Sequence, residues 1–224
     1  MTTEKVKFVN ANTVKLPFIE MAGYKDHSRN GGFNRQSVKN DWQTFVLKHD
    51  RDVEFFVDKM DVDESNLTLA AANVTNEFET QQDIPETDCY RISKLYAEMQ
   101  THSGTIDNTV PSAENILSLI DKAMKDMTED SVPLEGRVLY VTPTVEQYLK
   151  DAKELQRYLN INGSNDGKVK RTIVNLDGVK IKPILSARMK TKYDFSDGCK
   201  PGVTAKQINF ILFHPKSILA CDKH

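Results

Sequence analysis

The longest stretch without glycine constrains the fold of this chain more than any other feature. All ten glycines lie outside residues 33–103, so this segment has few natural backbone breaks. Its second half begins with an acidic cluster typical of a helix N-terminus, formed by Asp58, Asp61, Asp63 and Glu64. Apolar residues then recur every three or four positions, which predicts a long helix over about residues 65–100. The apolar positions are Leu67, Ala71, Val74, Phe78, Cys89, Ile92, Leu95 and Met99.

Pro85 interrupts this pattern and leaves two arrangements open. Positions 71, 78, 85, 92 and 99 keep one seven-residue register, which favours a kinked helix or two helices nearly end to end. A continuous helix would be ~54 Å long, whereas a compact globule of this chain length has a diameter of about 45 Å. Such a protomer would be elongated and would bury surface against neighbours. In the alternative arrangement, a break at Pro85 folds the two halves back on each other.

The first 60 residues predict a β meander. An extended segment over residues 14–19 leads to a polar stretch in which Asn30, Gly31 and Gly32 form a strong turn signal. Strands are expected over residues 38–46 and 53–57, with a turn between them. The expected sheet therefore has one large, polar hairpin tip.

The second half of the chain alternates helices with short strands. Ser112 is expected to cap an amphipathic helix, and a buried strand follows over residues 137–141. The next helix is expected to start at Thr142 and Pro143, because proline is tolerated in the first helical turn. A hairpin turn at Asp177 and Gly178 and a last strand over residues 208–213 complete an α+β pattern.

Composition excludes several classes of protein. The chain has 224 residues, with 30 Lys and Arg against 32 Asp and Glu, so its net charge of -2 gives no electrostatic signature of a duplex-DNA or membrane-surface protein. No apolar run approaches the ~18 residues of a membrane span, and the first residues lack the apolar core of a signal peptide. Three scattered cysteines give no disulfide framework, which indicates a globular protein of a reducing compartment.

Sequence motifs for catalysis, metal binding or cofactor binding are absent. There is no dinucleotide or phosphate-binding loop, nucleophile elbow, zinc-protease motif or CxxC pair. The acidic cluster lacks the glycine and distant glutamate of a calcium loop and is interpreted as a solvated helix start. The histidines are too dispersed to indicate a metal site and are expected at the surface: His27, His49, His102, His214 and His224. No catalytic residue, metal ligand or cofactor is assigned.

Two further groups have structural interpretations. Cys89 lies on the apolar stripe of the long helix and is expected to be a core residue rather than a nucleophile. An aromatic group near residue 50 is expected to form a sheet core rather than to stack nucleobases, because the neighbouring charges are mixed; it consists of Trp42, Phe45, Phe55 and Phe56.

Several segments taken together resemble one protein family. Residues 42–61 resemble tailed-bacteriophage major capsid proteins, and so do residues 76–94. The pattern Ile-Pro-Glu-x-Asp-x-Tyr-Arg at residues 84–91 is similar to the spine helix of capsid proteins from phages of Gram-positive hosts. Residues 136–143 and 174–179 resemble strands of the same family's axial domain, and residues 208–215 resemble the strand near its end.

The resemblance implies the Hong Kong phage-type capsid fold, which encapsulins share. Residues 1–22 would be a residual N-terminal arm and first strand, and residues 23–50 the extended loop. Residues 51–104 would form the peripheral domain with the spine helix, and residues 105–224 the axial domain and returning strands. By resemblance, the loop tip would contact other subunits through Asn30, Gly31, Gly32 and Phe33.

The implied function is structural and not enzymatic. Copies of the chain would assemble into the pentamers and hexamers of an icosahedral shell that encloses the genome, in the host bacterial cytoplasm, with scaffolding and portal proteins as further partners. No sequence-specific nucleic acid and no membrane is expected as a partner. Some relatives form a Lys–Asn isopeptide link between subunits. Lys25 and Lys39 lie in the corresponding loop, but no crosslink is assigned because no matching catalytic acid is found.

The chain departs from the family pattern at both ends. Family members usually have a longer N-terminal arm and extend further than residue 224. We therefore expect a form trimmed at both ends that stays monomeric or forms small oligomers. Two alternatives remain open: an encapsulin-like compartment shell, and a small-ligand enzyme whose site would draw on Asp88, Tyr90, Arg91 and His102.

Overall fold

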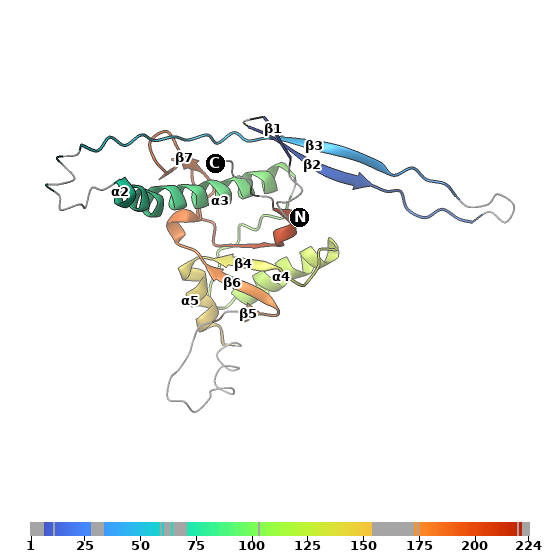
Figure 1. The fold of residues 1–224 in the computed structure, drawn as a ribbon. Coiled ribbons are helices and arrows are strands. Elements are labelled where there is room, and N and C mark those ends of the chain that lie inside the picture. Colours follow the sequence, from blue (N-terminus) through green and yellow to red (C-terminus); the bar gives the residue numbers. More distant parts are fainter. Residues whose placement is uncertain are drawn as a thin grey trace, which may run out of the picture. The chain divides into compact units, whose positions relative to one another are not determined.

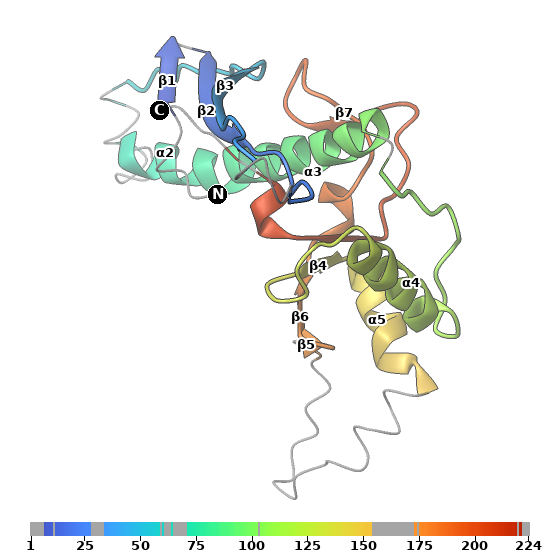
Figure 2. The same ribbon diagram turned by 90° about the vertical axis from the view of Figure 1, so that its right-hand side faces the viewer.

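The chain divides into two compact units that are described separately. One contains residues 1–56 and 219–224, and the other contains residues 57–218. The computed structural model describes residues 7–10, 12–27, 34–58, 60, 64, 71–102, 104–153, 173, 175–218 and 220. Figures 1 and 2 show the elements of each unit.

The first unit contains one antiparallel sheet in the order β1-β2-β3. Its strands are β1 (Lys7–Asn10), β2 (Thr13–Glu20) and β3 (Lys39–Val46). β2 and β3 pair along their whole length, from Thr13 opposite Val46 to Glu20 opposite Lys39. The predicted hairpin is therefore confirmed in its two strands, whereas β1 was not predicted.

The strand predicted over residues 53–57 does not form. The described residues 47–58 belong to no β ladder, and Figure 1 shows them as an extended run after β3. Valine and phenylalanine favour extended backbone, but a strand also needs a neighbouring edge with which to exchange hydrogen bonds. The turn expected between this strand and the preceding one is therefore wrong as well.

A long helix dominates one side of the second unit. It consists of α2 (Ala71–Phe78), the π-helical turn η2 (Glu79–Asp83) and α3 (Ile84–Thr101) without interruption. At 1.5 Å per residue its 31 residues extend over ~46 Å. Figure 1 shows α2 and α3 in line, so the alternative in which the chain folds back at Pro85 is wrong. Its predicted beginning, including Leu67, falls outside the described residues.

The π turn explains how the helix tolerates proline. The Ile84 amide donates to the carbonyl of Glu79, five residues back, and Pro85 lies in the first turn of α3. Proline lacks an N–H and its ring clashes with the carbonyl of the preceding turn, so it normally kinks or ends a helix. The wider π turn adjusts the backbone just before the proline, and the helix continues.

The other half of this unit is a four-stranded mixed sheet in the order β5-β6-β4-β9. β4 (Val138–Val141) pairs parallel with β6 (Val179–Pro183) and antiparallel with β9 (Phe210–Phe213), while β5 (Asn175–Leu176) forms a hairpin with β6. Asp177 and Gly178 both have positive φ angles, as the predicted two-residue hairpin turn requires.

Two helices pack together with this sheet, as Figure 2 shows. They are α4 (Ile116–Glu129) and α5 (Pro143–Asp151). Thr142 caps α5 as predicted, because its hydroxyl accepts the Val145 amide. The predicted cap of α4 is wrong by three residues: Asn115 is the N-cap, and its side chain accepts the Ser112 amide at 2.7 Å. The core between these elements contains Ile116, Ile120, Leu139, Val141, Val145, Leu149, Ala152, Val179 and Ile181.

Shorter elements connect the sheet with α3. They are the 3-10 turn η3 (Ser186–Arg188), the hairpin of β7 (Tyr193–Asp194) and β8 (Lys200–Pro201), and the 3-10 turn η4 (Pro215–Ser217). Among the described helices, none is both long enough and apolar enough to span a membrane.

Candidate functional site

The β2–β3 hairpin extends beyond the ends of its strands. Where the ladder stops, the Gln36 side-chain amide donates to the Gly23 carbonyl at 2.9 Å. The Asn34 amide donates to the carbonyls of Lys25 at 3.3 Å and Asp26 at 2.9 Å. Gln36–Gly23 and Asn34–Lys25 keep the register of the strands, so side chains continue the pairing in place of the backbone. The predicted contact residues Asn30, Gly31, Gly32 and Phe33 lie outside the described residues, and their role stays a prediction.

The aromatic side chains of this unit are exposed, which contradicts the predicted sheet core. Trp42 is 47% exposed and Phe45 is 43% exposed, and Phe55 and Phe56 are exposed as well. The reason is that the described part of this unit is a single sheet with no second layer. A sheet buries an apolar face only against another element.

Both faces of the sheet contain exposed apolar residues. Residues directly opposite each other share a face, so the register places the exposed Phe45 opposite the buried Val14, and the exposed Trp42 opposite the half-buried Pro17 on the other face. The first face also includes the exposed residues Phe8 and Phe18, and the second includes Ile19 and Val46. Contiguous exposed apolar surface of this kind is typical of an interaction site.

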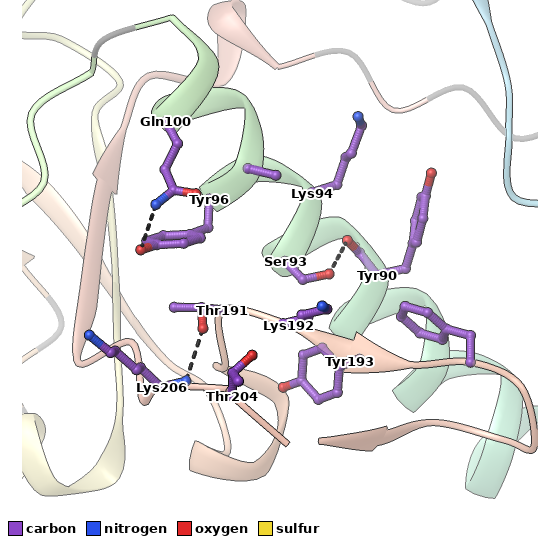
Figure 3. Close-up of a pocket in the computed structure, with 12 residues that line it drawn as sticks. Tyr90, Ser93, Lys94, Tyr96, Gln100, Thr191, Lys192, Tyr193, Thr204 and Lys206 are labelled. Carbon is purple, nitrogen blue, oxygen red and sulfur yellow. Dashed lines mark hydrogen bonds between the residues drawn. The ribbon is translucent and has the colours of Figure 1, made fainter. Parts of the chain in front are cut away.

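A groove of 580 Å³ lies in the second unit between α3 and residues 191–206, and we call it the α3 groove. Figure 3 shows α3 on one side and the segments around Thr191 and Lys206 on the other. These two segments are tied by the Thr191 amide, which donates to the Lys206 carbonyl at 3.0 Å, and by the Lys206 amide, which donates to the Thr191 hydroxyl at 2.9 Å. Its lining residues on α3 are Tyr90, Ser93, Lys94, Tyr96, Ala97 and Gln100.

Tyr193 lies at the bottom of the α3 groove and is 7% exposed. Its hydroxyl donates to the Ala187 carbonyl at 2.7 Å and accepts the Lys190 amide at 3.0 Å. Burial, with the neighbouring Cys89 thiol, raises the pKa of Tyr193 far above its ordinary value. Tyr193 is therefore a neutral structural group, and the predicted burial of Cys89 is confirmed.

Three of the four residues considered for an enzyme site contact different partners, and the fourth, Arg91, is an exposed residue of α3. Asp88 forms an ion pair with Arg188 of η3 at 2.7 Å, and this pair fastens α3 to the segment before β7. The Tyr90 ring lies edge-on to Phe195, with the ring centroids 5.8 Å apart. His102, at the end of α3, lies 3.4 Å from the Glu98 carboxylate. The described contacts of these residues thus give no shared cavity for a reaction.

One histidine differs from the prediction. His214 is buried, with its Nδ1 accepting the Lys216 amide and its Nε2 lying 3.1 Å from the Glu135 carbonyl. The two partners fit a neutral ring that donates from Nε2 and accepts at Nδ1. No three His, Cys, Asp or Glu side chains of the described residues are grouped so that they could hold a metal ion. Of the acidic cluster, Asp61 and Asp63 lie outside the described residues.

Comparison with known proteins gives a match in structure. No protein-family model matches the chain, and no curated protein matches it in sequence. The structure of the asymmetric unit of the bacteriophage PhiM1 mature capsid contains a similar chain, with a TM-score of 0.57 and 16% identity over 92% of this chain and 68% of that one. The fold is that of a phage capsid subunit. A chain of the structure described as Mycobacterium phage Che8 is similar too, with a TM-score of 0.55, 20% identity and the same coverage.

These likenesses confirm the fold predicted from the sequence. The α+β class, the capsid-type fold and the long helix formed by α2 and α3 agree with the expectation. The α3 groove was not predicted, because its two sides come from residues about 100 positions apart and share no local motif.

Proposed function

We propose that this chain is the major capsid (head) protein of a tailed bacteriophage or prophage. Its copies assemble into the icosahedral shell that encloses the genome, and its work is structural rather than catalytic. The proposal depends on one observation: the match to a chain of the PhiM1 mature capsid extends over 92% of this chain. The subunit would be located in the virion capsid after assembly in the host bacterial cytoplasm.

The exposed hairpin unit supports this function. A monomer that works alone gains nothing from a sheet with Trp42 and Ile19 exposed on one face and Phe45 on the other. Subunits of a shell bury such surface against their neighbours. In the proposed subunit, residues 23–50 are the extended loop, and its tip at Asn30, Gly31, Gly32 and Phe33 contacts another subunit.

The remaining regions have corresponding proposed roles. Residues 51–104 form the peripheral domain around the long helix, and residues 105–224 form the axial domain with the mixed sheet. Copies of the chain are its principal partners, arranged in pentamers and hexamers. Scaffolding and portal proteins are proposed as further partners of the assembling shell.

The test is whether the purified chain associates with itself. Sedimentation velocity over a wide range of protein concentration should show pentamers, hexamers or larger species that increase with concentration, and negative-stain microscopy should show capsomers or shells. Monomers at every concentration, both in this chain and in a form extended at its two ends, would contradict the proposal, because a trimmed form alone is expected to stay monomeric or to form small oligomers. Ile19→Asp should reduce association and leave the circular dichroism spectrum unchanged, because Ile19 is exposed in the isolated chain. The matched control is Thr44→Ser, which lies on the same face and leaves the apolar surface intact.

A further inference from the structure

The α3 groove has one sign of charge. Its cationic side chains are Lys94, Lys192 and Lys206, and none of its lining residues carries a carboxylate. Lys94 is already paired with Glu98 on the same helix at 2.6 Å. Lys192 and Lys206 are exposed on the two segments that face α3. The groove therefore offers two ammonium groups to an acidic ligand.

Aromatic rings line the same groove. Phe195 contacts Tyr90 edge-on, and its ring centroid lies 6.1 Å from that of Tyr193. Tyr96 lies one and a half helical turns beyond Tyr90 on α3, with its hydroxyl accepting the Gln100 amide at 3.1 Å. Aromatic side chains gain additional free energy when another ring packs on their edges or faces. A ligand that fits this groove thus combines carboxylates with an aromatic ring.

The first unit contains a segment with this chemistry, residues 50–56, which we call the acidic segment. Asp50, Asp52 and Glu54 are its carboxylates, and they outnumber its one cation, Arg51. The segment is exposed and extended and belongs to no β ladder (Figure 1). Alternate side chains of an extended chain point the same way, about 6.6 Å apart, so the three carboxylates and Phe56 share one side. Phe56 is 91% exposed.

We propose that the α3 groove receives the acidic segment of a second copy of this chain. Asp52 and Glu54 face Lys192 and Lys206, and Phe56 packs on the aromatic rings of the groove. This inference rests on the proposed self-assembly and names one pair of surfaces that takes part in it. It gives a reason why a segment rich in valine and phenylalanine has no strand partner among the described residues of its own chain: its partner is another subunit.

Single-stranded nucleic acid is the competing ligand, since lysines and aromatic rings also bind bases and phosphates. The charges of the chain favour the acidic segment. Nucleic-acid binding needs a track of many cations along the backbone, whereas this groove has three, of which Lys94 is neutralised by Glu98. The chain as a whole has a net charge of -2.

The test uses two charge-reversed variants of the whole chain. Lys192→Glu with Lys206→Glu makes the groove acidic, and Asp52→Lys with Glu54→Lys makes the segment basic. Each variant alone then juxtaposes like charges, and we expect its self-association, measured by sedimentation velocity, to weaken about tenfold or more. An equal mixture of the two should recover association, because each variant offers the surface that complements the other. Recovery on mixing requires contact between different copies.

The controls separate this inference from the proposed function. Lys125→Glu with Lys153→Glu makes the same change in net charge at exposed positions outside the groove, and it should associate as the wild type does. If the wild type assembles and the groove variant assembles equally well, this inference is wrong and the capsid function stands. If the mixture of the two variants does not recover self-association, the inference is also wrong. It is wrong as well if the only defect of the groove variant is loss of binding to a labelled single-stranded oligonucleotide. A wild-type chain that never associates would overturn this inference, and it would overturn the capsid function as well if a form extended at both ends also stayed monomeric.

Discussion

The buried Arg137 should be the side chain whose replacement most clearly tests the packing of α4 against the mixed sheet. It is 0% exposed, and its guanidinium donates to the carbonyls of Pro133 (3.0 Å), Val132 (2.6 Å) and Met124 (3.0 Å) and to the Thr128 hydroxyl (3.2 Å). These acceptors lie in the second half of α4 and in the loop that leads to β4. Arg137 therefore fastens the helix end to the start of the central strand.

The expected loss of stability follows from these contacts. In Arg137→Met, the Met124 carbonyl still accepts the Thr128 hydroxyl at 2.8 Å. The main loss is therefore that of the hydrogen bonds that Arg137 donates to the carbonyls of Val132 and Pro133. A hydrogen bond from a charged donor contributes about 1.5–3 kcal/mol, and methionine recovers part of this by burying an apolar chain without the cost of desolvating a charge. We expect the free energy of unfolding to fall by about 2–4 kcal/mol.

Urea-induced unfolding followed by circular dichroism measures this change. The free energy of unfolding of Arg137→Lys should fall between those of the wild type and Arg137→Met. The reason is that an ammonium is a point charge that cannot reproduce the planar fork of the guanidinium. Arg35→Met, at an exposed position, is the control and should stay within about 0.5 kcal/mol of the wild type. An Arg137→Met chain that is as stable as the wild type, or more stable, would refute this account of the buried guanidinium.

Three further predictions concern local structure. Gly178 has a φ angle of 82°, so Gly178→Ala should lower the free energy of unfolding by about 1 kcal/mol, measured by urea denaturation. Thr142→Ala removes the cap of α5 and should cost about 1 kcal/mol in the same assay. Hydrogen bonds from Lys122 and Thr109 hold the pKa of Asp107 below its ordinary 3.8. The ionised carboxylate therefore stabilises the folded chain above pH 3.8, and this stabilisation is lost as the pH falls through the lowered folded-state pKa. Asp107→Asn should remove that component from a pH titration of stability.

Each of these has a result that would contradict it. Gly23→Ala is the control for the glycine, since Gly23 has no positive φ angle and no atom near an added Cβ, and the two substitutions should differ. Thr142→Ser keeps a capping hydroxyl and should retain most of the stability that alanine loses. If the free energy of unfolding of Asp107→Asn falls at acid pH as it does in the wild type, the ion pair with Lys122 does not contribute to stability.

The part of the chain after α3 was the more predictable because its signals are local. Thr142 with Pro143, and Asp177 with Gly178, specify a helix start and a tight turn through the chemistry of adjacent residues. The long helix was predicted from the absence of glycine and the apolar spacing. The π turn that makes Pro85 compatible with the helix was not predicted, because no local residue pattern specifies it.

The failures concern features that depend on distant partners. The strand expected over residues 53–57 has the right residue types, but it pairs with no sheet edge in the part of the chain that the structure describes. Trp42 and Phe45 are apolar, yet their burial requires a second layer that the described unit lacks. The α3 groove depends on α3 lying beside residues 191–206, and no local pattern reports such an arrangement. Burial and clefts are properties of the whole arrangement, so a single sequence reports them weakly.

The π turn in the long helix also has an evolutionary consequence. A hydrogen bond that reaches back five residues instead of four accommodates one extra residue, which corresponds to about 100° of rotation around the helix axis. The seven-residue register that runs through Pro85 in the sequence is therefore not a straight line on the helix surface. A homologue with one residue fewer between Phe78 and Ile84 could form an uninterrupted α-helix whose two ends keep the same relative orientation, because the π turn absorbs the extra residue. Loss or gain of one residue at this point would thus leave the relative orientation of the two packing surfaces unchanged, while the helix itself stays intact.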